Sequence, residues 1–515
     1  MKHLLLFFLL PCLLQAQSPH PNILITNNYN PNEPTLALDP NNPNIMLGGS
    51  NIDNLYISKD AGKTWREKKL ESSYGVWGDP VIICDTTGSF YFFHLSNPPN
   101  GSWIDRIICQ RSDNQGRSWT NGSYMGLNGR KAQDKHWAVV DRKKNYIYVT
   151  WTQFDKYKSA DPKDKSSIRF SMSKDKGETW TTAKKINEVE GDCLDNDDTT
   201  EGAVPTIGPD GEVYVAWAGP AGLVFDRSLD EGNTWLDNDI KIDPMPGGWD
   251  LHIPGISRCN GMPITSCDLS GNEHHGTIYV NWADQRNGTK NTDIWLSKST
   301  DKGDTWSTPV RVNNDDSERH QFLTWMTIDD KTGYLYFVFY DRRDTKGNAT
   351  EVYMARSTDG GATFTNFRVS QSPFIPNPNI FFGDYNNIVA QGDIIRPIWT
   401  RLDGEKLGMY TALIDVTKID DAQSLPDTSR LHENTDLAHK YLHVSFKTHD
   451  RQKLTLLLRN ANNKKVKILF RKKAFDMGKH IEKFEKTTLD LPKGNYTYQL
   501  KQGCKTIKSK PFVIE

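Results

Sequence analysis

The sequence has few cysteines and, after its first residues, no long apolar run. Only seven cysteines occur in 515 residues, and their spacing matches none of the usual metal sites. The one long apolar run, residues 4–10, follows Lys2 and His3 and leads to Gln15-Ala16, as in a secretory signal peptide cleaved after residue 16. No other run is long enough to cross a membrane. We therefore expect an exported protein without a membrane span, secreted, on the cell surface or periplasmic.

Six cysteines remain once the signal peptide leaves. In an exported protein some of them are expected to pair, and Cys259 and Cys267, which are close in sequence, are the best candidates. A zinc site that combines these two with His274 or His275 is the alternative.

The net charge of −1 conceals two oppositely charged parts. Residues 437–515 carry 19 Lys and Arg against 6 Asp and Glu, so the remaining residues have a net charge of −14. A basic end suits docking on an anionic polysaccharide or a cell surface, and a solvated lysine-rich face is the alternative. Nothing in the sequence indicates nucleic acid, a nucleotide or a redox cofactor.

An eight-residue pattern, Ser-x-Asp-x-Gly-x-Thr-Trp, occurs six times. The copies begin at Ser58, Ser112, Ser173, Ser228, Ser299 and Ser357, with Asn114, Ser118 and Phe364 as departures. The Asp side chain can accept backbone N–H groups and close a tight turn, the Gly supplies a backbone angle that other residues disfavour, and the aromatic ring is expected to be buried. Each copy therefore predicts a hairpin turn, and the spacing of 54 to 71 residues predicts one propeller blade per copy.

A second repeat, a short apolar strand, occurs seven times upstream of these turns. The strands begin near Glu33, Asp79, His136, Glu201, Gly261, Trp325 and Asp384. Residues 388–413 supply only three strands for the seventh blade, and residues 22–26 could add the fourth and close the ring, which explains the absent seventh turn. We predict an all-β fold: a seven-bladed β-propeller over residues 22–415, with six blades as the alternative, a linker over 416–436 and a small β-sandwich over 437–515.

Candidate functional residues cluster at the starts of the first strands and the ends of the second strands, which meet at the channel mouth opposite the turns. The predicted catalytic residues are Glu201, Tyr385, Asp79, His136 and Asp384, and the predicted substrate-binding residues are Arg258, Arg319, Arg342, Arg401, Trp77 and Trp249. Carboxylates supply acid and base, arginines bind carboxylate or sulfate, and aromatic faces contact sugar rings. The alternative is that these residues only cap loops and pair between blades.

The eight-residue pattern resembles the Asp-box of sialidase-like β-propellers, over residues 22 to about 415. The resemblance implies a glycoside hydrolase that acts on an acidic oligo- or polysaccharide. It implies that Tyr385 is a nucleophile activated by Glu201, that Asp79 is the acid/base, and that three of Arg258, Arg319, Arg342 and Arg401 bind the substrate carboxylate. The Arg-Ile-Pro motif of the family is absent, since no arginine precedes Arg66. The C-terminal residues are similar to sorting domains of the type IX secretion system.

Two other functions remain open at this point. A propeller polysaccharide lyase would cleave uronic-acid chains by β-elimination, with His136, Tyr385 and Arg258 in its site. A non-catalytic glycan-binding propeller is the third possibility. The only cofactor that the sequence suggests is calcium at the acidic segment 191–198, for which a solvated loop is the alternative.

Overall fold

The computed structural model describes residues 18–419, 441–448, 451–462, 464–475, 478–489, 491–503 and 505–514. The predicted signal peptide and most of the predicted linker lie outside these residues. The chain divides into two compact units, one within residues 16–424 and the other within residues 425–515. No helix of the described part is long and apolar enough to cross a membrane.

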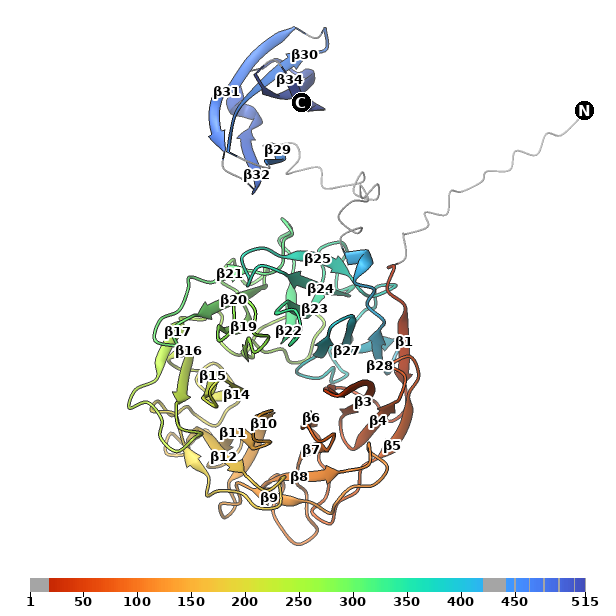
Figure 1. The fold of residues 1–515 in the computed structure, drawn as a ribbon, viewed down its shortest axis with the longest axis vertical. Helices are drawn as coiled ribbons and strands as arrows, with labels where there is room; N and C mark the ends of the chain where they lie inside the picture. The colour runs from red at the N-terminus through yellow and green to blue at the C-terminus, as the bar shows by residue number, and fades with distance from the viewer. Residues whose placement is uncertain are drawn as a thin grey trace, which may run out of the picture. The chain divides into compact units, whose positions relative to one another are not determined.

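The first unit is a ring of four-stranded antiparallel sheets (Figure 1), and its described residues form seven of them. We number these sheets as blades in chain order. Blade 1 contains β2 (Thr35–Asp39), β3 (Asn42–Ser50), β4 (Asn54–Ser58) and β5 (Arg66–Lys69), and blade 2 contains β6 (Val81–Cys84), β7 (Phe90–Leu95), β8 (Ile107–Ser112) and β9 (Ser123–Met125). Blade 3 contains β10 (Ala132–Val140), β11 (Ile147–Phe154), β12 (Ser166–Ser173) and β13 (Lys184–Lys185), and blade 4 contains β14 (Glu201–Ile207), β15 (Val213–Gly219), β16 (Gly222–Ser228) and β17 (Ile240–Asp243).

The remaining blades follow the same order. Blade 5 contains β18 (Ile264–Cys267), β19 (Ile278–Asp284), β20 (Asp293–Ser299) and β21 (Val310–Arg311), and blade 6 contains β22 (Gln321–Ile328), β23 (Leu335–Asp341), β24 (Glu351–Ser357) and β25 (Thr365–Arg368). Blade 7 contains β26 (Asn387–Gln391), β27 (Ile394–Asp403), β28 (Lys406–Ala412) and, as its outer strand, β1 (Asn22–Thr26). The all-β propeller expected from the sequence is confirmed.

The two ends of the propeller segment pair in blade 7. β1 runs antiparallel to β28, with Asn22 opposite Ala412 and Thr26 opposite Met409. The third and fourth strands of this blade therefore come from opposite ends of the segment, and no turn of the chain joins them. This arrangement accounts for the absence of a seventh Asp-box.

Every Asp-box forms the turn between the third and fourth strands of its blade. In blade 1 the amide of Thr64 donates to Asp60 Oδ1 at 2.9 Å, and the amide of Gly62 donates to Ser58 Oγ at 2.9 Å. The third strands of blades 1 to 6 all end on the serine that begins a box. The hydrogen bonds confirm the predicted role of the box as a turn.

The boxes also fasten neighbouring blades together. In blade 4, Gly232 approaches the preceding blade so closely that an added Cβ would lie 2.3 Å from the ring of Phe170. Lys184, also from the preceding blade, donates to the carbonyl oxygens of Gly232 at 3.0 Å and Asn233 at 2.7 Å. Each of the other boxes receives an equivalent bond: from Arg396 to Ala61, Lys68 to Arg117, Arg111 to Lys176, Arg227 to Lys302, and Lys298 to Gly360.

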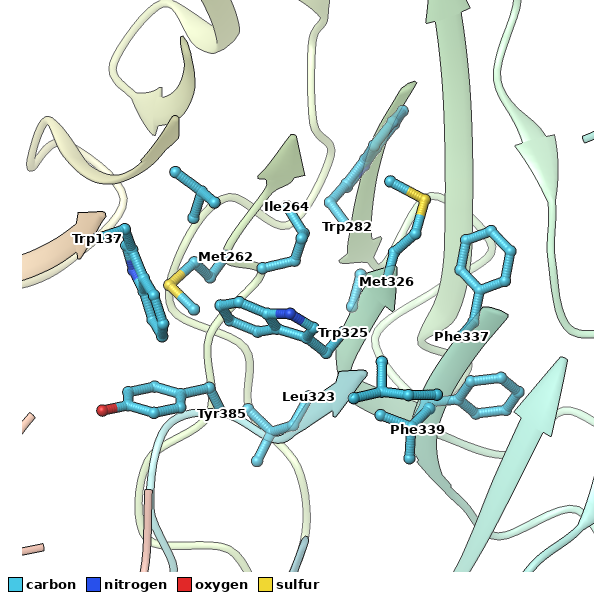
Figure 2. Packing of buried hydrophobic residues seen from close by; sticks show 14 of the residues in the cluster. Trp137, Met262, Ile264, Trp282, Leu323, Trp325, Met326, Phe337, Phe339 and Tyr385 are labelled. Atoms are coloured by element: carbon cyan, nitrogen blue, oxygen red, sulfur yellow. The ribbon is translucent and has the colours of Figure 1, made fainter. Parts of the chain in front are cut away.

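Aromatic and apolar side chains fill the inner part of the ring. Figure 2 shows Trp137, Met262, Trp325 and Tyr385, which come from four different parts of the chain, gathered in one cluster. The ring centroids of Trp137 and Trp325 lie 4.5 Å apart, and those of Trp137 and Tyr385 lie 5.0 Å apart. These side chains pack closely against one another and restrict the movement of the first-strand starts.

The second unit is also all-β and has its own core. β29 (Tyr441–Thr448) pairs with β32 (Gly478–Glu485), and a second sheet has the order β31 (Lys465–Phe475), β30 (Gln452–Asn460), β33 (Gly494–Gln502) and β34 (Lys505–Ile514). A short 3-10 helix, η2 (Lys486–Leu489), follows β32. Val444, Leu454, Leu456 and Leu500 belong to an apolar cluster of this unit alone.

The cysteine prediction is wrong. Cys84, Cys109, Cys193, Cys259 and Cys267 are all free and buried, and Cys504 lies outside the described residues. Cys267 is the last residue of β18, whereas Cys259 lies in the loop that precedes this strand. The described residues contain no cluster of His, Cys, Asp and Glu that fits a metal ion, so neither the zinc nor the calcium alternative gains support.

The contact between blades can be tested at a box glycine. Gly232→Ala should lower the melting temperature for two reasons. The added methyl group would clash with Phe170, which costs roughly 1–3 kcal/mol. A side chain at φ 83° costs about 1–2 kcal/mol more. Gly271→Ala is the matched control, since Gly271 has φ 76° and a Cβ added there would meet no atom within 4 Å. Equal losses in the two variants, measured by thermal unfolding, would contradict the role of the box in joining blades.

Candidate active site at the channel mouth

The starts of the first strands lie at the end of the propeller opposite the boxes. Within a blade, the first and third strands run parallel, and the third strand ends at the box. Several of these starts adopt backbone angles that non-glycine residues rarely take: φ is 54° at Glu33, 49° at Asp79, 49° at Lys135 and 48° at Leu323. Such strain persists only where the surrounding structure enforces it, and it clusters at functional sites.

Bulges accompany this strain. The pairing of β10 with β11 shifts between Asp134 and Trp137, and that of β14 with β15 shifts between Glu201 and Val204. A bulge inserts an extra residue and redirects the side chains beside it. The polar residues at these starts therefore do not simply follow the alternation of the strand behind them.

Asp384 lies between two cations. Lys135 Nζ is 2.9 Å from Asp384 Oδ2, Arg258 Nε is 2.9 Å from Oδ1, and Arg258 Nη2 contacts Oδ2. Burial opposes ionisation of this carboxyl, but Lys135 and Arg258 outweigh burial and lower the pKa of Asp384 to about 2. Asp384 is therefore a carboxylate at every pH at which the protein would ordinarily work.

Arg258 has a second acidic partner, Asp195. Arg258 Nη1 lies 3.2 Å from Asp195 Oδ2, which also accepts a hydrogen bond from the Tyr157 hydroxyl at 3.1 Å. The guanidinium lies 5.0 Å from the ring centroid of Phe381, which is 38% exposed. No sequence pattern indicates that Asp195, Tyr157 and Phe381 lie together, because they come from three loops.

Tyr385 is buried with an unpartnered hydroxyl. Its side chain is 3% exposed, and no described residue bonds to Oη. Burial raises the pKa of Tyr385, and Glu33 is the largest charge that raises it further, followed by Asp79. Oδ2 of Asp79 also has no hydrogen-bond partner among the described residues, with Lys135 Nζ 4.0 Å away. A buried polar atom without a partner needs an explanation, and a bound water, an ion or a catalytic role is one.

Glu33 and Glu201 occupy different parts of the site. Burial, Asp79 and Asp384 raise the pKa of Glu33, whereas burial and then Asp195 raise the pKa of Glu201. Both acids favour the protonated form more than Asp384 does. Glu33, and not Glu201, is among the main charges that raise the pKa of Tyr385, and the pair of Tyr385 and Glu201 stays a prediction.

His136 points into the protein and is 1% exposed. Its ring centroid lies 6.5 Å from that of Phe93, and burial lowers its pKa to about 4 despite the opposing charge of Asp79. The imidazole is therefore neutral near pH 7.

The predicted substrate-binding residues make different contacts. Arg401 pairs with Asp403 at 2.8 Å and bonds to the carbonyl of Ser372, whereas Arg319 donates to the carbonyl of Arg342. Trp249 is 3% exposed and packs against Gly202, so it cannot present its face to a sugar. Trp77, at 40% exposed, can. Of the four predicted arginines, Arg258 is the one that pairs with Asp384, and binding of a substrate carboxylate by these arginines stays a prediction.

One comparison with known proteins agrees with the repeats. Residues 276–503 match the model of the BNR repeat-like domain. These residues are therefore similar to BNR repeats, and the structure places most of them in a β-propeller. The matched segment contains two of the six Asp-boxes and extends into the second unit.

Several solved structures are similar to this chain at low identity. A protein of unknown function from Dyadobacter fermentans is 15% identical, with 66% of this chain and 98% of that chain covered and a TM-score of 0.42. The NanB sialidase of Streptococcus pneumoniae is 10% identical, with 72% and 83% covered and a TM-score of 0.41. A leech intramolecular trans-sialidase is 11% identical, with 69% and 70% covered and a TM-score of 0.41. No curated protein matches the sequence.

Asp384 is held by Lys135 and Arg258, an arrangement that we call the clamp. It predicts that the stability difference between wild type and Asp384→Asn depends on pH. Asp384→Asn should destabilise the protein by about 3–5 kcal/mol, because it leaves the buried Lys135 and the half-buried Arg258 without their shared carboxylate. The pKa of Asp384 falls from 3.8 to about 2 on folding, so its contribution is present above about pH 4 and lost as the pH falls toward 2. Thermal unfolding of both proteins between about pH 3 and 7 measures this difference.

Asp403→Asn is the control for this comparison, because the Asp403 carboxylate is 49% exposed and its pair with Arg401 should contribute little. Equal melting temperatures of wild type and Asp384→Asn at neutral pH would contradict the clamp. So would a difference in melting temperature that stays the same as the pH is lowered.

Proposed function

We propose that the protein is an exported glycoside hydrolase that acts on an acidic glycan at the channel mouth. The observation that carries this proposal is the open pair of atoms, Tyr385 Oη and Asp79 Oδ2, inside a cluster of carboxylates. Glycosidases use two acidic groups of different protonation, or a Tyr in place of one of them.

The groups have distinct roles in this reaction. Tyr385 Oη attacks the anomeric carbon as Glu33 accepts the phenol proton, and the leaving oxygen takes a proton from Asp79 as the glycosidic C–O bond breaks. Asp79 then accepts a proton from water, whose oxygen attacks the anomeric carbon, and the bond to Tyr385 breaks with return of the proton from Glu33. Glu33 accepts this proton only in its ionised form, and its raised pKa places that form toward higher pH.

Lys135, Arg258 and Asp384 position this machinery. Asp384 is ionised and pairs with both cations, so it fixes Lys135 and Arg258 in place. Three partly exposed aromatic side chains could contact sugar faces: Phe381 beside Arg258, Trp103 beside Tyr157, and Trp77. Trp103 is 44% exposed and its ring centroid lies 5.5 Å from that of Tyr157.

β-Elimination of a uronic-acid chain is the second candidate, and the neutral state of His136 favours it. A lyase needs an unprotonated base near neutral pH, and a pKa of about 4 provides one. The deep burial of His136, at 1% exposed, weighs against direct contact with a substrate. Docking of the basic C-terminal unit on an anionic surface remains a separate proposal that rests on its net charge of +13.

Two substitutions test the hydrolase. Glu33→Gln should lower kcat by roughly 10²–10⁴-fold through loss of the base, and Tyr385→Phe should remove turnover through loss of the nucleophile. Tyr148→Phe is the matched control, because Tyr148 is also buried with an unpartnered hydroxyl but lies near the box end of β11. The measurement is product analysis on sialylated, uronic-acid, sulfated and neutral glycans.

The products separate the three functions. A released sugar that disappears with Tyr385→Phe and persists with Tyr148→Phe supports the hydrolase. An unsaturated product that disappears with His136→Ala would replace it with the lyase. Binding without any product, unaffected by Glu33→Gln, would identify a non-catalytic glycan-binding propeller.

A further inference from the structure

Exposed aromatic side chains lie along the connection between blades 1 and 2. Residues 70–80 join the outer strand β5 to the inner strand β6, so they run from the rim of the propeller to the channel on the mouth face (Figure 1). Tyr74 and Trp77 lie on this connection and precede Asp79. Among the described residues, Trp77 and Trp103 are the tryptophans that are exposed, and both flank blade 2. Exposed apolar surface of this kind marks a place that binds a partner or a ligand.

Tyr74 packs against Tyr124, which lies on the outer strand β9. The two ring centroids are 5.6 Å apart, with an angle of 63° between the ring planes. The guanidinium carbon of Arg106 lies 4.8 Å from the centroid of Tyr124 and 5.8 Å from that of Tyr74. Arg106 is itself held by two hydrogen bonds to Asp105, at 2.8 and 3.0 Å. These contacts orient both rings, while Tyr124 remains 41% exposed.

The connection is fixed to the loop that follows β7. The amide of Asn97 donates to the carbonyl of Tyr74 at 3.0 Å, and the amide of Trp77 donates to the carbonyl of Leu95 at 3.0 Å. Between them, Gly75 has φ 70°, and a Cβ added there would lie 2.3 Å from the carbonyl oxygen of Asn97. The aromatic side chains therefore project from a backbone that is already ordered, and such a surface loses little conformational entropy when it binds a ligand.

A groove lies at the outer end of the connection. Its volume is about 550 Å³, and its lining includes Lys68, Ser73, Arg117, Trp119 and Asn121. The amide of Ser73 donates to Asn121 Oδ1 at 2.9 Å, and Asn121 Nδ2 donates to Ser73 Oγ at 2.6 Å. Trp119 Nε1 has no partner among the described residues. Hydroxyl, amide and ammonium groups around an aromatic ring suit a ligand that is rich in hydroxyl groups, because each hydroxyl both donates and accepts.

We infer that residues 68–80 and 117–125, which we call the seam, bind the sugar units of a glycan chain that lie beyond the unit at the channel mouth. The chain passes from Asp79 over Trp77 to Tyr74 and Tyr124, and its far end lies in the groove. The inference rests on the proposed function. It specifies the substrate as a chain of several sugar units rather than a single sugar at the end of a short glycan.

Continuity with the candidate active site favours a glycan over another occupant of the seam. Trp77 is two residues from Asp79, whose Oδ2 is open to a ligand. The aromatic pair and the groove follow on the same connection, in order from the channel to the rim. One extended ligand that begins at the site of cleavage accounts for all three features.

Binding of labelled oligosaccharides to the full chain tests this inference. Long chains of polysialic acid, polygalacturonic acid, chondroitin sulfate and xylan are compared with the disaccharide of each, and fluorescence anisotropy gives Kd. Tyr385→Phe serves as the parent protein, so that binding is measured without turnover. Kd should fall as the chain lengthens for the glycan that fits. Adding Tyr124→Ala should raise the Kd of the long chain roughly three- to tenfold, because one aromatic contact is lost.

Tyr146→Ala is the matched control. Tyr146 is half-buried and lies 5.0 Å from Lys174 Nζ, as Tyr124 lies beside Arg106, but it directly precedes β11 at the box end of the propeller. It should keep the dependence of Kd on chain length. Hydrogen exchange is a second measurement that needs no substitution in the seam: the long chain should slow exchange in residues 70–77 and 121–125, whereas the disaccharide should not.

The outcomes separate the seam from the proposed hydrolase. Absence of binding, or a Kd that does not fall with length for any of the four glycans, overturns the inference. A gain with length that Tyr124→Ala leaves intact overturns it as well. Cleavage of a short glycan without any effect of length would keep the hydrolase and reject the seam. Length-dependent binding without cleavage of any glycan would reject the hydrolase and leave the seam as a glycan-binding surface.

Discussion

The fold depends on one repeated interaction, in which a basic side chain of one blade donates to the backbone of the next blade's Asp-box. Arg396, Lys68, Arg111, Lys184, Arg227 and Lys298 make these bonds at 2.6 to 3.2 Å. Blade 7 has no box, and the N-terminal segment joins it to blade 6 instead: Ser18 Oγ donates to the carbonyl of Arg368 and Asn22 Nδ2 to that of Val369. Each contact between neighbouring blades therefore contains at least one hydrogen bond from a side chain to the backbone of the next blade or of the preceding one.

A ring fixed in this way can hold like charges close together. Acidic side chains from several blades meet at the mouth, where Lys135 and Arg258 keep Asp384 ionised while burial and neighbouring acids raise the pKa of Glu33 and Glu201. Burial of the large aromatic and apolar core stabilises the unit and offsets the energetic cost of these unfavourable groups. Groups with opposite protonation states in one site are what acid and base chemistry requires.

The sequence predicted the parts of the molecule that local patterns determine. The boxes, the strands and the closure by residues 22–26 follow from short motifs and their spacing, and the convergence of Asp79, His136, Glu201 and Asp384 on one end follows from strand direction. The neighbours of each residue could not be predicted in the same way. Bulges within β10 and β14 shift the register, and loops far apart in the chain bring Asp195 and Phe381 to Arg258. Trp249 resembled a binding residue because burial is not visible in composition, and the free state of Cys259 and Cys267 was equally hidden.

Because Tyr385 acts as a nucleophile in the proposed reaction, the most direct test is the stereochemistry of the first product. Proton NMR of the reaction in its first minutes would identify the anomer that is released before mutarotation. Two displacements at the same carbon predict retention of configuration. An inverted anomer would contradict the role of Tyr385, because a single displacement by water leaves no place for a covalent intermediate.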